Sequence, residues 1–168
     1  MKIIKELLVS DTAELLENIQ NHPHKGEMEN ALARKYCYRV HILPEDFSEI
    51  LINSSIVDRH LDLPEYPTLE QVIKDIATHI QFLETTRKDG RLSGTKVKYY
   101  FDKFSENIPL LDLVFLISRN EFPAMNPKGI YYIRDGMHRL VAFGLASQMR
   151  VEHFPIYGYY STNKRIGS

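Results

Sequence analysis

The stretch that most constrains the fold is YYIRDGMHRLVAFGLA, from Tyr131 to Ala146. Its apolar start predicts a strand over Ile130–Arg134, and the run Met137–Ser147 predicts a helix. The Asp-Gly pair between them is typical of a tight turn. A strand that passes directly into a helix indicates a domain in which helices pack on a sheet.

Two further runs predict strands. The near-continuous apolar segment Ile108–Ile117 is typical of a buried strand. A third strand is predicted over Val151–Tyr160, where Pro155 indicates an edge strand or a bulge. The tail from Ser161 onward is predicted to be frayed. Together with the helices, these strands predict an α+β fold with a small mixed β-sheet flanked by helices.

The clearest helix begins at Thr68, which forms a capping box with Gln71, and its apolar stripe continues to Leu83. The segment 92–95 predicts a turn, and the apolar residues from Val97 to Phe104 predict a short amphipathic helix. The stretch of about 85–107 is longer than such a fold needs. We interpret it as an insertion that serves as a lid or a partner surface.

The first 45 or so residues predict a helical extension. Asp11 begins a capping-box-like segment, and the helix that follows ends before His22-Pro23. Residues 23–30 predict a polar loop. The segments 36–43 and 47–52 are extended or mixed, and their pattern does not decide between strand and helix.

Composition limits the class of protein. A chain of 168 residues predicts one domain, over 1–168. No apolar run is long enough to predict a membrane span, and the single cysteine, Cys37, makes no intramolecular disulfide, so we expect a cytoplasmic protein. The net charge of -1 disfavours nucleic acid as a partner without excluding it.

The Asp-Gly-Met-His-Arg turn carries the chemistry. Asp135 can cap the helix, and Gly136 allows a ligand to approach the backbone. The N-terminus of a helix attracts anions. At this N-terminus Arg139 adds a planar guanidinium suited to phosphate or carboxylate oxygens, and His138 adds a switchable hydrogen-bond donor. The same residues also fit a junction that has only a structural role. Because short motifs match by chance, these five residues taken alone favour that structural interpretation. The functional hypothesis is a cradle for nucleotide phosphate.

The segment IRDGMHRLVAFGLA, preceded by IPLLDLVFLI and followed by VEHFPIYGYY, resembles the ParB N-terminal/sulfiredoxin-like superfamily, which includes the ParB-like nuclease domains. The superfamily includes chromosome-partition ParB domains, sulfiredoxins and an ADP-dependent free serine kinase. The resemblance implies that this turn binds nucleotide phosphates. It implies contacts from Asp135, Gly136, Met137, His138 and Arg139, with His138 also a catalytic candidate.

Upstream, IVDRHLDLPEYPTLEQVIKDI resembles the family's Arg-bearing, Pro-rich segment beside the nucleotide. The resemblance implies that Arg59 is a second phosphate ligand and that Asp58 or His60 is an acid/base. Met137 stands where sulfiredoxins have their catalytic cysteine, and a thioether is no thiolate nucleophile. We therefore exclude sulfinic-acid repair. Too little chain follows the last strand for a complete partition protein.

The expected ligand is ATP, ADP or CTP, with Mg²⁺ to neutralise charge. The expected activity is a phosphotransferase or a nucleotide hydrolase with an unknown small-molecule substrate. Two alternatives stay open: a ParB-like nuclease or DNA-associated protein, and a non-catalytic binding module. No metal-ligand residues are predicted.

Weaker signals lie elsewhere. His22-Pro-His24 is a poor metal signature and indicates a loop. Glu45 and Asp46 are adjacent carboxylates of the kind that cap or solvate a turn. Lys96, Lys98 and Lys103 indicate a solvated helix face, and the pair Tyr99-Tyr100 offers a surface for stacking on bases.

Overall fold

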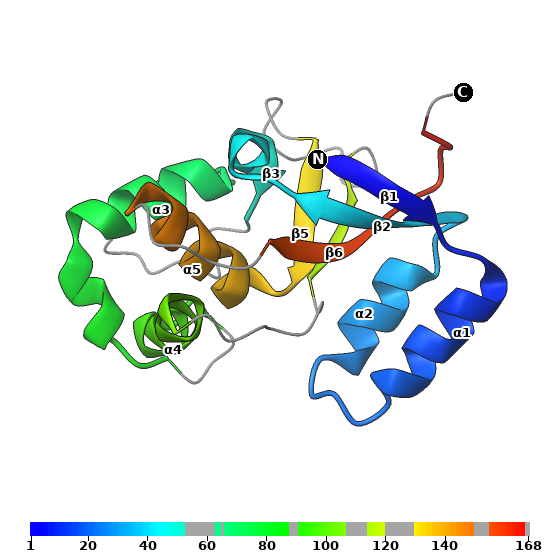
Figure 1. Cartoon of the computed structure of the whole chain (residues 1–168), viewed down its shortest axis with the longest axis horizontal. Coiled ribbons are helices and arrows are strands. Elements are labelled where there is room, and N and C mark those ends of the chain that lie inside the picture. Colours follow the sequence, from blue (N-terminus) through cyan, green and yellow to red (C-terminus); the bar gives the residue numbers. More distant parts are fainter. Residues whose placement is uncertain are drawn as a thin grey trace.

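The computed structural model describes residues 1–52, 63–64, 66–87, 91–106, 114–119, 130–149 and 155–166. Within them the protein has an α+β fold, with helices packed on both faces of a six-stranded mixed sheet (Figure 1). The strands are β1 (Lys2–Glu6), β2 (Tyr36–Ile42), β3 (Ile50–Leu51), β4 (Phe115–Ser118), β5 (Tyr131–Asp135) and β6 (Ile156–Thr162). The helices are α1 (Val9–Asn18), α2 (Lys25–Leu32), α3 (Leu69–Thr78), α4 (Gly94–Ser105) and α5 (Met137–Gln148), with short 3-10 helices η1 (Pro44–Ser48) and η3 (Ile80–Glu84).

The sheet has the order β1-β2-β6-β4-β5-β3. β6 is antiparallel to β2 and parallel to β4, and β5 is antiparallel to β4 and parallel to β3. The prediction that Pro155 marks an edge strand or bulge is therefore wrong, because β6 is an interior strand. Pro155 precedes the strand, where its missing N–H costs the ladder nothing.

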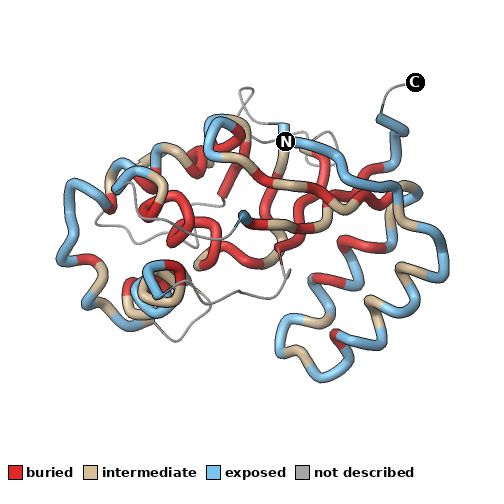
Figure 2. The backbone as a smooth tube through the Cα atoms, viewed as in Figure 1, coloured by how far each residue is buried: buried red, intermediate tan, exposed pale blue. Residues whose placement is uncertain are grey.

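The alternation of side chains along the strands separates two apolar cores. On β4, Leu116 joins the core beneath α3, α4 and α5, whereas Phe115 and Ile117 join the core beneath α1 and α2. On β5, Ile133 and Tyr132 divide in the same way. Buried residues accordingly follow the sheet and the inner sides of the helices (Figure 2).

The predicted buried strand Ile108–Ile117 is present as β4, at Phe115–Ser118, with all four residues buried. The part of the prediction that covers 108–113 lies outside the described residues. The predictions for β5 and α5 are confirmed to within one residue at each end. The predicted fraying of the tail is wrong at its start, because Ser161 and Thr162 are buried in β6.

The N-terminal predictions need most correction. Residues 23–30 were expected as a loop, yet α2 begins at Lys25, because Met28, Ala31 and Leu32 are buried against the sheet. The extension also contributes strands β1 and β2. α1 begins at Val9, so Asp11 occupies the third helical position, where its carboxylate accepts from the Leu8 N–H at 2.9 Å.

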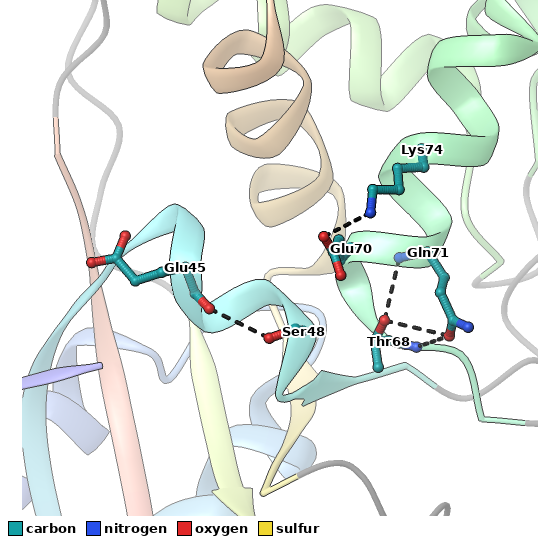
Figure 3. A network of polar contacts seen from close by, with 6 residues as sticks. All are labelled: Glu45, Ser48, Thr68, Glu70, Gln71 and Lys74. Atoms are coloured by element: carbon teal, nitrogen blue, oxygen red, sulfur yellow. Dashed lines mark hydrogen bonds and ion pairs between the residues drawn. The ribbon is translucent and has the colours of Figure 1, made fainter.

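The capping box of α3 is confirmed. The Gln71 N–H donates to Thr68 Oγ1 at 3.3 Å, and the Thr68 N–H donates to Gln71 Oε1 at 2.9 Å (Figure 3). The helix is shorter than the apolar stripe predicts, since it ends at Thr78 and the chain continues as η3 after His79.

The structure also tests the predictions for Asp46 and for the segment 92–95. Asp46 caps η1 by accepting from the Leu43 N–H at 2.7 Å, as expected of a turn carboxylate. The predicted turn at 92–95 is the start of α4, which begins at Gly94.

Among the helices of the described segments, none has the length and apolar character required to cross a bilayer.

Candidate functional site

The junction between β5 and α5 is a tight turn at one residue. Gly136 has a φ of 90° and forms the N-cap of α5. This left-handed conformation is strained for residues that carry a Cβ, which explains glycine at the position. Because glycine has no side chain, no side-chain cap accepts from the N–H groups of the first turn of α5. Those N–H groups carry the positive end of the helix dipole.

A pocket of about 950 Å³ opens at this junction. Five parts of the chain form its walls: the segment 22–24 with Glu27 of α2, Ile52 after β3, most of β5, the start of α5, and one side of α4. The predicted residues Asp135, Gly136, Met137, His138 and Arg139 all line it. The structure therefore gathers the motif at one concave surface. Asp58, Arg59 and His60 lie outside the described residues.

Arg139 is held inside the pocket wall. Its Nη2 lies 3.3 Å from Asp135 Oδ2, and its guanidinium carbon lies 5.8 Å from the centre of the Tyr100 ring. Both members of the ion pair are largely buried. Burial raises the pKa of Asp135, and the nearby Arg139 charge opposes that rise. Burial likewise lowers the pKa of Arg139.

This arrangement corrects the expected role of Asp135. The residue was predicted to cap the helix, but it lies in β5, and Gly136 holds the N-cap position. Asp135 instead pairs with Arg139 one helical turn further along the chain. An anion that enters the pocket would compete with this carboxylate for the guanidinium.

His138 also differs from its expected state. Its Nε2 accepts a hydrogen bond from the Ser93 N–H at 3.0 Å. Burial, with a smaller contribution from the charge of Lys96, lowers the pKa of His138 from 6.5 to about 4. The ring is therefore neutral at pH 7 and does not switch its charge near that pH, whereas the sequence predicts a switchable donor. Through this bond, His138 ties the start of α5 to the residue before α4.

Met137 contributes mainly to the core. Its side chain is buried and belongs to the cluster beneath α3, α4 and α5, although it also reaches the pocket surface. This packing suits a thioether, which is apolar and flexible. Met137 is thus a packing residue at the edge of the pocket.

Several pocket residues were not predicted as site residues. His22 and His24 lie in the predicted loop, and Lys96 is exposed on α4 as predicted, and all three also line the pocket. The two imidazole rings lie 5.8 Å apart, and Arg134 of β5 pairs with Glu27 of α2 across the same wall. No spacing in the sequence relates these residues to the turn at 135–139. They meet because α2 packs against β5 while α4 packs against α5, the helix that directly follows β5.

The electrostatic character of the pocket is mixed. Asp135 and Glu27 each face an arginine, so their charges are balanced locally. Lys96 is exposed, and within the described segments no carboxylate forms an ion pair with it. The described residues also include no group of three or more His, Cys, Asp or Glu side chains placed to hold a metal ion. The uncompensated charge at the pocket is therefore positive.

Comparison of the chain with protein-family models, with curated protein sequences and with solved structures finds no match in any of the three. The case for a function therefore depends on the geometry and chemistry of the pocket.

Proposed function

We propose that the protein binds a nucleotide in this pocket and holds its phosphates at the start of α5, as the resemblance to the ParB N-terminal/sulfiredoxin-like superfamily implies. The observation that carries the proposal is the opening of the pocket onto a helix N-terminus whose cap is a glycine with a φ of 90°. Backbone N–H groups and the helix dipole at such an end attract phosphate oxygens.

The cations around the pocket support the same ligand. Lys96 lies on α4 at the pocket wall and supplies a positive charge that no described carboxylate balances. Arg139 adds a guanidinium whose position is held by Asp135 and Tyr100. Its planar fork matches phosphate oxygens, which would compete with the Asp135 carboxylate for it. Neutral His138 contributes by fixing the wall rather than by charge.

ATP, ADP and CTP are the proposed ligands, and the proposed activity is phosphoryl transfer or nucleotide hydrolysis. Mg²⁺ would enter bound to the nucleotide, since it commonly binds through phosphate oxygens with few protein ligands. Mg²⁺ prefers oxygen ligands, and the pocket offers the carboxylates of Asp135 and Glu27. Each of these carboxylates is already paired with an arginine. The role of acid/base stays with Asp58 or His60 as a prediction.

A thermal-shift titration with ATP, ADP, CTP and GTP, with and without Mg²⁺, tests the proposal. A ligand at about 100 times its Kd stabilises the folded state by about 2.7 kcal/mol, which raises Tm measurably. If none of the four nucleotides at millimolar concentration changes Tm, the proposal is wrong.

Lys96→Ala should reduce the shift while leaving the fold intact, because the side chain is exposed. Lys98→Ala is the matched control. Lys98 lies on the same helix, pairs with Asp102 at 2.7 Å and does not line the pocket. Equal loss of binding in both variants would mean that charge in general, rather than the pocket, attracts the nucleotide. Arg139→Ala is less suitable, since it leaves the buried carboxylate of Asp135 without this partner.

A further inference from the structure

The pocket is larger than phosphate groups require. Its volume of about 950 Å³ is in the range of sites that enclose a whole cofactor or drug-sized ligand. Away from the phosphate end at α5, its wall is α4, within the segment that the sequence marked as an insertion. Thr95, Lys96, Tyr99 and Tyr100 of α4 line the pocket. Residues three and four apart on a helix share one face, so these side chains form one continuous surface.

The two tyrosines of this surface form an aromatic path that begins at the guanidinium. The Arg139 guanidinium carbon lies 5.8 Å from the Tyr100 ring centre, and the Tyr100 and Tyr99 ring centres lie 5.3 Å apart with the planes at 74°. Tyr100 is thus placed between Arg139 and the outer ring. Tyr99 keeps 57% of its surface exposed. Because Tyr99 lines the pocket and is exposed, its ring is available for stacking on a ligand.

We propose that Tyr99 stacks on the base of a nucleotide whose phosphates lie at the start of α5, so that α4 is the base-recognition wall of the site. This inference rests on the proposed function. Lys103 supports the ring, with its ammonium 5.6 Å from the Tyr99 ring centre. Because every base has a π-face, stacking on one ring is tolerant of base identity. The ligand class is therefore a nucleoside diphosphate or triphosphate with weak base preference, rather than an inorganic polyphosphate or a phosphorylated metabolite without a ring.

Calorimetric titration with ADP, CDP and pyrophosphate tests the proposal, because pyrophosphate carries a diphosphate group without the base. We expect wild-type protein to bind ADP and CDP with similar affinity and pyrophosphate at least about tenfold more weakly. Tyr99→Ala should weaken ADP and CDP binding by roughly 5- to 100-fold, the range found when a stacking ring is removed, and leave pyrophosphate binding unchanged. Tyr99→Phe keeps the ring and should bind ADP as wild type does.

Lys98→Ala serves again as the control on the same helix, and circular dichroism of each variant checks that α4 is retained. If Tyr99→Ala binds ADP as tightly as wild type, or if pyrophosphate binds as tightly as ADP, the base-recognition wall is wrong while the phosphate site stands. If neither ADP nor CDP nor pyrophosphate binds, this inference fails, and the proposed function fails with it when none of ATP, ADP, CTP and GTP changes Tm. If a single-stranded oligonucleotide binds more tightly than any free nucleotide and depends on Tyr99, the ligand class is wrong.

Discussion

The buried, neutral state of His138 makes the stability of the protein depend on pH in a defined window. In the unfolded chain the imidazole gains a proton as pH falls through about 6.5, whereas in the folded protein its pKa is about 4. Between these values the unfolded state binds more protons, so the free energy of unfolding falls as pH falls. The stability is fully present above pH 6.5 and is lost progressively down to about pH 4.

The size of the effect follows from the shift. One pKa unit corresponds to about 1.4 kcal/mol, so the contribution of His138 amounts to roughly 3 kcal/mol over the whole window. Asp135 acts in the opposite direction, because burial raises its pKa and its protonation favours the folded state as pH falls. The protein has seven histidines, so the contribution of one must be isolated by difference.

The substitution His138→Gln isolates the contribution of His138 to the pH dependence of the free energy of unfolding. The glutamine amide oxygen can accept from the Ser93 N–H in place of Nε2, but it does not titrate. Urea unfolding at half-unit steps from pH 4.5 to 7.5 should show a smaller loss of stability in the variant than in wild type, with the curves diverging below pH 6.5. His79→Gln, which changes an exposed histidine outside the pocket, is the reference for removing an imidazole. Parallel curves for wild type and His138→Gln would refute the reasoning, as would an NMR titration of His138 with a midpoint near 6.5.

Four substitutions test the backbone geometry at three glycines and the cap of α3 by urea unfolding. Gly94→Ala should destabilise by about 3 kcal/mol, because a Cβ there would overlap the backbone carbonyl of Phe82; a loss below about 1 kcal/mol would contradict that close approach. Gly136→Ala should cost roughly 1–2 kcal/mol through its positive φ, whereas Gly26→Ala, which meets no atom within 4 Å and lies within α2, should be neutral or stabilising. Thr68→Ala should cost about 1 kcal/mol through loss of the α3 cap, and an unchanged midpoint would show that the cap is dispensable.

Local patterns were sufficient for elements whose signals lie within a few residues. The capping box at Thr68 and the sharp turn at Gly136 follow from side-chain hydrogen bonding and backbone sterics that any chain with these residues obeys. The same holds for the apolar run that contains β4. In these cases the free energy that selects the conformation is local, so the sequence shows it directly.

Tertiary contacts decided the elements that the patterns missed. α2 is short and contains a glycine, so its intrinsic helix propensity is weak. It forms because burial of its apolar side against the sheet outweighs that weak propensity. The interior position of β6 depends on its pairing with β2 and β4. The order of strands in a sheet depends on partners that are distant in the chain. The residues of one strand do not indicate which strands these partners are.

The candidate site divides in the same way. The sequence by itself determined that the glycine turn and its Asp, His and Arg neighbours stand at a helix start, because those residues are contiguous. Only the tertiary structure decided what they do: Asp135 pairs with Arg139, His138 accepts from Ser93, and α4 brings Lys96 and Tyr99 to the pocket. The physical reason is that burial and charge at this site come from segments distant in the chain, and these effects exist only after the chain has folded.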